Sequence, residues 1–299
     1  MSSLSHPNMF SIQVLLFCIL VVHVPQCFGD YHLDLSYDVH EKSAHWVNDI
    51  PFSRKTIRKG YTSRGYWYES YNFCMSEHTS THLDAPSHFS EGKWSVEQIP
   101  VSHLMGPGVV IDIQHKVAKD SLAQVTGDDI MAWIDEHGEL PDGVIVFLRT
   151  GWSSKYGNTT AYFGISNNDT SNLNFPGMAL EAAQLLTAYK TATGHQVMGV
   201  GLDTPSIDYG ASTDFHAHIE LSSANIFIME NVANLEKLPA KGFHVMVMPM
   251  KLRGGSGAPA RILASLPDTS AATQITMKVS VISFLSVIMA QIFVYLQSF

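Results

Sequence analysis

Charged side chains are missing from both ends of this 299-residue chain. Residues 1–29 contain no Lys, Arg, Asp or Glu, and their apolar centre ends at the small residues Cys27 and Gly29. This pattern is typical of a secretory signal peptide cleaved before Asp30, with an uncleaved membrane anchor as the alternative. Residues 279–299 also lack charge, and no basic residue follows them, which argues against a stop-transfer helix.

The C-terminal segment, residues 271–299, has the layout of a lipid-attachment signal. The small residues Ser270, Ala271 and Ala272 precede a short polar spacer and an apolar tail, as in GPI-anchor signals. A single membrane-spanning tail is the alternative. We therefore expect a mature domain over residues 30–270 that passes through the secretory pathway and is held at the membrane surface by a C-terminal anchor.

Cysteine and basic residues are also scarce. Two of the three cysteines fall in the expected signal peptide, so Cys74 is left without a disulfide partner, and we expect it to be a small buried apolar side chain. Residues 30–270 hold 17 Lys and Arg against 27 Asp and Glu, and 17 − 27 = −10 excludes a basic nucleic-acid-binding surface. Sequons at Asn158 and Asn168 predict an exposed, glycosylated loop.

Short apolar runs with helical patterns between them predict an α/β fold. Five runs rich in Val, Ile, Phe or Met are expected to be buried strands: 108–113, 143–152, 197–203, 225–232 and 244–251. Two segments have helical spacing, 126–138 with Thr126 as N-cap and 177–194 ending at Gly194. No repeat or linker interrupts residues 30–270, so we expect a single domain with a mixed, barrel-like sheet and flanking helices.

The stretch "SEHTSTHLDAPSHFSEG", residues 76–92, crowds His78, His82, Asp84 and His88 together. On a strand, alternate side chains project to one face, so His78, Ser80, His82 and Asp84 would form a single ridge. Two imidazoles and a carboxylate make an open metal site suited to Zn²⁺ or Mn²⁺. A chance cluster in a chain with 15 histidines is the alternative.

This stretch resembles the signature of the cyclase family, His-x-Gly-Thr-His-x-Asp-x-Pro-x-His, which is shared by bacterial-type kynurenine formamidases and isatin hydrolases. The resemblance continues through residues 201–210, 216–239 and 250–264, and it covers nearly all of residues 31–266. It implies a swivelling β/α type of fold and a homodimer. Ser80 departs from the pattern, because the family has Gly there, and a serine is strained wherever the backbone needs an angle that only Gly tolerates.

The resemblance also implies the roles of the site residues. Five of them would bind one or two divalent ions: His78, His82, Asp84, His218 and Glu230. His88 would be the catalytic acid/base.

Three further features have two interpretations each. Asp203 and Asp208 either orient the metal ligands or cap turns. The aromatic segment 65–73 either packs in the core or walls a pocket for an aryl group. The glycine-rich segment 254–261 is either a tight loop, which we expect because it lacks the Lys-Ser/Thr of a phosphate-binding loop, or a phosphate-binding segment.

These observations predict a metal-dependent hydrolase of small amides. A metal-activated water would attack the carbonyl, and His88 would protonate the leaving nitrogen. The resemblance makes an arylformamidase the leading expectation, converting N-formyl-L-kynurenine to L-kynurenine and formate in tryptophan catabolism. Ring opening of a cyclic amide such as isatin is the alternative. A second hypothesis, from a different class, is a catalytically inactive cell-surface binding protein on the same fold.

Overall fold

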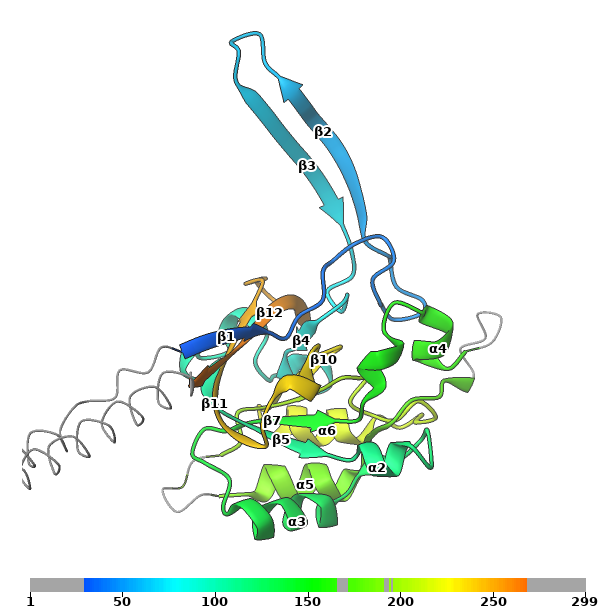
Figure 1. Ribbon diagram of the computed structural model, residues 1–299, viewed down its shortest axis with the longest axis vertical. Coiled ribbons are helices and arrows are strands. Elements are labelled where there is room, and N and C mark those ends of the chain that lie inside the picture. The colour runs from blue at the N-terminus through cyan, green and yellow to red at the C-terminus, as the bar shows by residue number, and fades with distance from the viewer. Residues whose placement is uncertain (1–29, 166–171, 191–193, 195, 268–299) are drawn as a thin grey trace, which may run out of the picture. The chain divides into compact units, whose positions relative to one another are not determined.

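The computed structural model describes residues 30–165, 172–190, 194 and 196–267, and residues 32–266 form one compact unit (Figure 1). The expected signal peptide and the expected C-terminal anchor both lie outside the described residues. Within the described part of the chain, no helix is long and apolar enough to cross a membrane.

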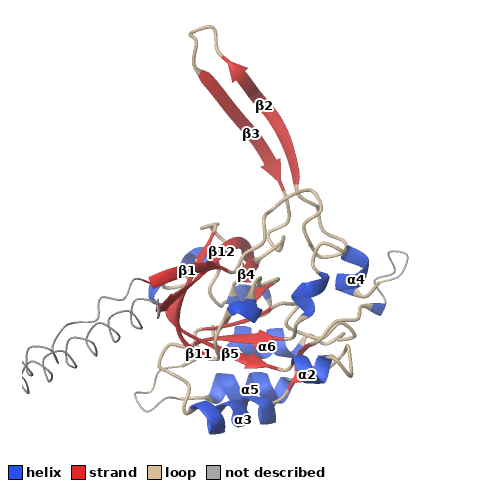
Figure 2. Ribbon diagram, viewed as in Figure 1, coloured by secondary structure: helices blue, strands red, loops and turns tan. Residues whose placement is uncertain are grey.

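Strands and short helices alternate along the chain (Figure 2). The strands are β1 (Asp30–Asp34), β2 (Ser53–Tyr61), β3 (Trp67–Cys74), β4 (His82–Asp84), β5 (Met105–Asp112), β6 (Gln124–Val125), β7 (Ile145–Arg149), β8 (Gly177–Met178), β9 (Gly199–Leu202), β10 (Phe227–Glu230), β11 (Lys241–Pro249) and β12 (Gly257–Pro267). The α-helices are α2 (Gln114–Val117), α3 (Gly127–His137), α4 (Thr159–Phe163), α5 (Leu180–Ala188) and α6 (His216–Ser223). The 3₁₀ turns are η1 (Pro86–His88), η2 (Val96–Gln98), η3 (Val101–His103), η4 (Trp152–Lys155) and η6 (Leu235–Lys237).

The main sheet closes on itself as a barrel. Its strand order is β1-β12-β11-β5-β7-β9-β10-β4, and β4 pairs also with β12, so the seven strands from β12 round to β4 form a ring. The four strands β5, β7, β9 and β10 run parallel, whereas β4, β11 and β12 pair antiparallel to their neighbours. The expected α/β fold with a mixed, barrel-like sheet is confirmed.

The parallel strands β7, β9 and β10 are apolar up to Arg149 at the end of β7 and Glu230 at the end of β10, because both faces of these strands are covered. In β7, Ile145 and Phe147 point into the barrel interior with Phe243, while Val146 and Leu148 point outward. The outward side chains pack under helices α3, α5 and α6, which contribute residues to the same cluster. Alternation of side chains across a strand therefore divides one apolar run between two cores.

The two expected helices are present, but the second is shorter at both ends than expected, because Gly177 and Met178 form β8 and α5 begins at Leu180. Helix α3 begins after Thr126, and the hydroxyl of Thr126 and the carboxylate of Asp129 cap it reciprocally. Helix α5 ends at Ala188 rather than at Gly194. The chain becomes extended at Tyr189, whose ring packs against the core and whose hydroxyl accepts a hydrogen bond from Leu140 N.

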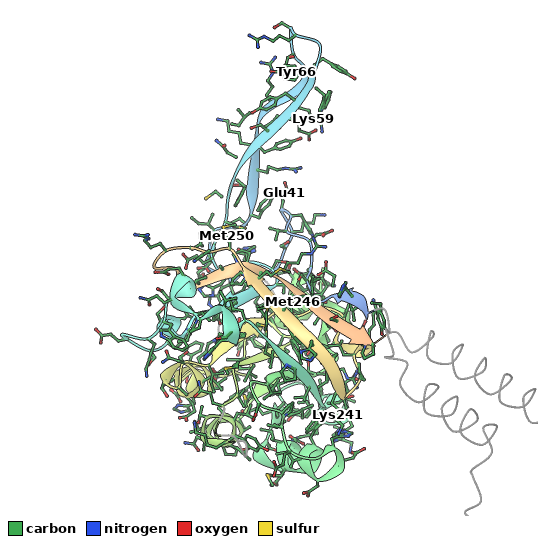
Figure 3. All side chains as sticks on the ribbon, turned by 90° about the vertical axis from the view of Figure 1, so that its left-hand side faces the viewer. Glu41, Lys59, Tyr66, Lys241, Met246 and Met250 are labelled. Atoms are coloured by element: carbon green, nitrogen blue, oxygen red, sulfur yellow. The ribbon has the colours of Figure 1, made fainter. Side chains whose placement is uncertain are left out.

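Strands β2 and β3 form a two-stranded sheet of their own. Figures 1 and 3, which view the molecule from directions a quarter turn apart, both show this hairpin standing away from the barrel, with Tyr66 near its tip. Two expectations are thereby wrong. The aromatic segment 65–73 does not pack in the core, because Tyr66, Trp67, Tyr68 and Phe73 are exposed, and Cys74 at the base of the hairpin is exposed as well.

Candidate metal centre

The histidine-rich stretch is a turn followed by a short strand, not the continuous strand that the sequence predicted. Strand β4 covers only His82–Asp84, because Ser80 has the left-handed backbone conformation, with φ of 60°. A residue in that conformation cannot continue a β-ladder. This left-handed turn explains why the cyclase-family pattern has Gly at this position.

Despite that difference, the metal-seeking side chains converge. His78 Nδ1 lies 2.6 Å and His82 Nε2 lies 3.1 Å from Asp84 Oδ1. The remaining two expected ligands come from α6 and β10: His218 Nε2 lies 3.5 Å from Asp84 Oδ2 and 3.2 Å from Glu230 Oε1. Glu230 Oε2 lies 3.4 Å from His82 Nε2, so the five side chains enclose one region.

These separations suit a bound divalent ion. Two ligands on one ion at about 2.0–2.2 Å each cannot have donor atoms much more than about 4 Å apart. His82 and Asp84 are almost completely buried, yet His82 Nε2 and Asp84 Oδ2 have no hydrogen-bond partner in the described protein. A buried polar atom without a partner is costly, and an ion between these two atoms would satisfy both.

Carboxylates dominate the electrostatics of the cluster. Burial alone would lower the pKa of His82, but Asp84 and Glu230 raise it to about 10. Burial would also lower the pKa of His218, but the carboxylates of Asp208, Asp84 and Glu230 around the ring raise it well above its ordinary value. The site therefore holds positive charge, either as protons on the imidazoles or as a metal ion in their place.

Backbone and side-chain acceptors fix the imidazole orientations. Asp208 Oδ2 accepts a hydrogen bond of 2.7 Å from His218 Nδ1, which leaves Nε2 of that ring facing Asp84 and Glu230. The carbonyl oxygen of Ser80 accepts a hydrogen bond from His82 Nδ1 at 2.9 Å. Second contacts of this kind set the tautomer and direction of metal-binding histidines.

The two aspartates that the sequence left open therefore have different roles. Asp208 orients a candidate ligand, whereas Asp203 caps a turn by accepting hydrogen bonds from the backbone of Thr150 and Gly151 and from the Thr150 hydroxyl.

The glycine-rich segment contributes to the site, which the sequence did not predict. Only its start is a loop, because β12 begins at Gly257. A Cβ atom at Gly257 would lie 2.4 Å from the His78 ring, so glycine leaves room for that imidazole. The hydroxyl of the adjacent Ser256 lies 3.1 Å from His78 Nε2 and donates to Glu77. In the sequence, only the high glycine content of this segment could have indicated that it lies close to the site.

His88 follows the cluster on the short turn η1. Its ring stacks on that of His78 with 4.1 Å between centroids, and one of its nitrogens lies within 4.8 Å of donor atoms of Asp84 and His218. Burial lowers the pKa of His88 to about 4, and the neighbouring His78 and His218 add to this effect while Asp84 opposes it. His88 is therefore a neutral imidazole near neutral pH, close enough to act on a ligand of the cluster or to bind an ion itself.

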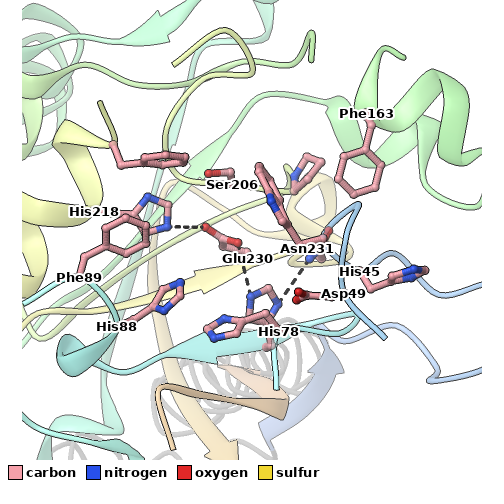
Figure 4. Close-up of a pocket in the computed structure, with 14 residues that line it drawn as sticks. His45, Asp49, His78, His88, Phe89, Phe163, Ser206, His218, Glu230 and Asn231 are labelled. Atoms are coloured by element: carbon pink, nitrogen blue, oxygen red, sulfur yellow. Dashed lines mark hydrogen bonds and ion pairs between the residues drawn. The ribbon is translucent and has the colours of Figure 1, made fainter. Parts of the chain in front are cut away.

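A cavity of about 230 Å³ opens beside the cluster (Figure 4). The metal-seeking histidines lie at one end of it, and Phe163 and His45 lie at the other. Four aromatic side chains contribute to its walls: Trp46, Phe89, Phe163 and Phe215. Ser206, Asn231 and Asp49 add polar groups, and sequence reasoning had identified none of these wall residues.

Comparison with protein families and individual proteins gives one consistent relationship. Residues 33–209 match the family model "Putative cyclase". Isatin hydrolase from Roseibium aggregatum is 34% identical over 211 residues, covering 69% of this chain and 78% of that protein. Kynurenine formamidase from Bacillus cytotoxicus is 26% identical over 235 residues, covering 77% of this chain and 95% of that protein.

Solved structures agree with the sequence comparison. Isatin hydrolase A from Labrenzia aggregata, bound to benzyl benzoate, superimposes with a TM-score of 0.71 at 28% identity, covering 86% of this chain and 100% of that one. A structure described as a potential metal-dependent hydrolase with cyclase activity has a TM-score of 0.59 at 26% identity, covering 79% of this chain and 98% of that one.

Proposed function

The chain belongs to the cyclase family of metal-dependent hydrolases, and from that premise we propose that it hydrolyses the C–N bond of a small aryl amide. The observation that carries this proposal is the buried cluster of three imidazoles and two carboxylates at the end of an aromatic cavity. A cavity of about 230 Å³ is slightly smaller than the roughly 300–1,000 Å³ of sites for drug-sized ligands, which favours a substrate with one or two rings.

The donor set fits one or two divalent ions of the Zn²⁺ or Mn²⁺ class. His78, His82 and Asp84 have donor atoms within 4.8 Å of one another, and Asp84 Oδ2, His218 Nε2 and Glu230 form a second set, with His218 Nε2 3.5 Å from Asp84 Oδ2 and 3.2 Å from Glu230 Oε1. Asp84 belongs to both groups, so its two carboxylate oxygens can serve two positions. A bound ion of this class supplies Lewis acidity and a water of lowered pKa.

His88 is the proton-transfer residue in this proposal. Its neutral imidazole accepts the proton of the attacking water and passes it to the departing nitrogen, which is a poor leaving group without a proton. Its stacking on His78 places it at the rim of the cluster, beside Phe89 of the cavity wall. The aromatic side chains exclude water and hold the aryl ring of the substrate.

Two aryl amides are the candidate substrates. A cyclic amide of the isatin type comes first, because the relative with the higher identity, 34%, is an isatin hydrolase and the structural neighbour with a TM-score of 0.71 is one too. An aryl formamide such as N-formylkynurenine, which the family resemblance had placed first, comes second, on relatives at 26% identity. Both substrates need the same attack on an amide carbonyl whose nitrogen is attached to an aromatic ring.

The substrate test uses residues 30–270, which contain the compact unit whole. The protein is loaded with Zn²⁺ or Mn²⁺ and assayed for isatin ring opening and for formate release from N-formylkynurenine. We expect turnover of at least one of them. A folded, metal-loaded sample that turns over neither, while binding an aryl ligand, would support the inactive binding protein instead.

Two histidine variants separate metal binding from proton transfer. His82→Ala removes a ligand, so we expect both metal and activity to be lost. His88→Ala should keep its metal while amide turnover falls by about 10²–10⁴, with a smaller fall for a matched aryl ester, whose leaving group needs no proton. If the His88→Ala protein is metal-free, or loses amide and ester hydrolysis equally, His88 is a ligand or a structural residue.

A further inference from the structure

The loop of residues 44–50 forms part of the wall of the cavity beside the metal centre. Asp49 N donates a hydrogen bond of 2.8 Å to Trp46 O, so residues 46–49 form a tight turn. The side chains of Trp46 and Asp49 both line the cavity. One turn thus brings a carboxylate and an aromatic ring to the same cavity.

Backbone hydrogen bonds at both ends hold this loop against the histidine-rich segment. At one end, Ser80 N donates to Ala44 O at 2.7 Å. At the other end, Ser76 N donates to Ile50 O at 3.1 Å, and the Ser76 hydroxyl donates to Asp49 Oδ2 at 2.7 Å. The Asp49 carboxylate is therefore fixed relative to the metal ligands, which belong to the same segment as Ser76 and Ser80.

One oxygen of the Asp49 carboxylate is available to a ligand. The Ser76 hydroxyl occupies Oδ2, whereas Oδ1 accepts no hydrogen bond from the residues that the structure describes. The side chain is half-buried, and Figure 4 shows it between His78 and His45 at the cavity. A carboxylate oxygen of this kind forms a strong hydrogen bond with a cationic donor.

The surrounding residues also favour a cation at this place. None of the described residues that line the cavity is a Lys or an Arg. A negatively charged substituent on a substrate would therefore meet the like charge of Asp49, unless it displaced the reacting amide from the metal centre. The Trp46 ring, which contacts Phe163 edge to face with 6.4 Å between centroids, adds an aromatic group, and such groups attract cations.

We propose that Asp49 selects aryl amides that carry a protonated amine on a short side chain of the ring, and rejects those that carry a carboxylate there. This inference rests on the proposed function, in which the amide lies at the metal centre and the ring lies between the aromatic walls. The ammonium group then donates a hydrogen bond to Asp49 Oδ1. An aliphatic amine is cationic near neutral pH, as the lysine side chain is.

Three formamides with the same ring test the preference: N-formylkynurenine, its analogue without the carboxylate, and its analogue without the amine. We expect kcat/KM to be highest for the analogue that has only the amine. It should exceed that of the analogue that has only the carboxylate by about 100-fold, because the hydrogen bond to a charged group and the like-charge repulsion act in the same direction. The amine contact is made before and during the reaction, so the difference should lie in KM rather than in kcat.

The variant Asp49→Asn removes the charge and keeps an acceptor for the Ser76 hydroxyl. Relative to isatin, which has no charged substituent, kcat/KM for the amine should fall by about 10–100-fold in this variant. Asp38→Asn is the matched control, because Asp38 is an exposed acid whose contacts with Ser43 and Ser80 use its backbone carbonyl. We expect the control to keep the wild-type ratio, and both variants to keep their metal content.

Binding measurements separate a failure of this proposal from a failure of the proposed function. Calorimetry with the metal-loaded full chain in mild detergent compares two uncleavable ketones, 2-aminophenyl 2-aminoethyl ketone and the neutral 2-aminoacetophenone. We expect the amine to bind at least tenfold more tightly and to lose this advantage in Asp49→Asn. If no amide is turned over, the proposed function fails, and the binding ratio alone decides the role of Asp49. Equal binding of the two ketones, or an Asp49→Asn protein with unchanged ratios, overturns the proposal.

Discussion

At the scale of single residues, Ser80 is both a departure from the family pattern and part of the site's framework. Its hydroxyl lies 3.0 Å from the hydroxyl of Tyr156, its amide donates to Ala44 O, and its carbonyl accepts hydrogen bonds from His82 Nδ1 and Asn231 Nδ2. Three of the four contacts use backbone atoms that any residue provides. The serine therefore leaves the direction of the His82 ring intact.

We predict that Ser80→Gly keeps metal content and turnover. Glycine removes left-handed strain of about 1 kcal/mol, while the lost hydroxyl contact costs about 0.5–1.5 kcal/mol, so the free energy of unfolding should change little. Ser80→Ala keeps the strain and loses the contact, so it should be less stable than Ser80→Gly by about 1 kcal/mol. Urea unfolding of both variants measures this. A glycine variant with higher metal affinity would show instead that Ser80 weakens the site.

At the scale of elements, helix α3 is fixed by its first turn. Asp129 accepts hydrogen bonds from the amide and the hydroxyl of Thr126. It also forms an ion pair with Lys116, with 2.7 Å between the two charged atoms, and this pair anchors the helix to α2. Burial raises the pKa of Asp129, but the hydrogen bonds from Lys116 and Thr126 outweigh it and lower the pKa below its ordinary value. The carboxylate thus stabilises the folded chain only while it is ionised.

We predict that Asp129→Ala lowers the free energy of unfolding by about 1–2 kcal/mol, through loss of the cap and the ion pair. The pKa is lower in the folded state, so this stabilisation is complete above the unfolded pKa of about 3.9 and disappears as the pH falls through the folded pKa. Urea titrations of both proteins from pH 7 to pH 3 check this. A stability difference that stays constant to pH 3 would contradict the assignment.

A comparison of the observed helices and strands with the predicted ones shows where sequence patterns were sufficient to place an element. The apolar runs of β7 and β9 and the capped helix α3 follow from local composition, and each lies close to its predicted place. The strand expected over residues 78–84 failed because the left-handed turn at Ser80 depends on contacts with Ala44 and Asn231, which are distant in sequence. The aromatic hairpin was misassigned because alternating aromatic residues form the same sequence pattern whether they are buried in a core or exposed to solvent.

At the scale of the whole molecule, the metal centre joins distant parts of the chain. His78 comes from a loop, His82 and Asp84 from β4, His218 from α6 and Glu230 from β10. The sequence could offer the first three as a group because they are neighbours in the chain. The other two were identified only by family resemblance, since no local pattern reveals that α6 and β10 lie beside β4.

We predict that metal removal lowers stability and changes its pH dependence. An ion present at about 100 times its Kd adds about 2.7 kcal/mol. Without metal, protonated His82 contributes stability that is complete below its ordinary pKa of 6.5 and is lost as the pH rises toward about 10. Thermal unfolding with and without chelator from pH 6 to pH 9 measures both effects, and calorimetry in two buffers should detect proton release on metal binding. Equal pH profiles with and without metal would exclude this coupling.

The three-residue strand β4 has a consequence for folding during synthesis. Asp84 is held between Ile228 of β10 and Gly257 of β12, so the ring cannot close until the last strand is made. Domains generally fold as units during synthesis, and contacts between residues that are distant in sequence form slowly. During translation, the histidine-rich segment therefore cannot be enclosed by the barrel until the residues of β12 have been synthesised. A chain stalled before Gly257 would therefore carry all five expected ligands without the strand that closes the ring around them.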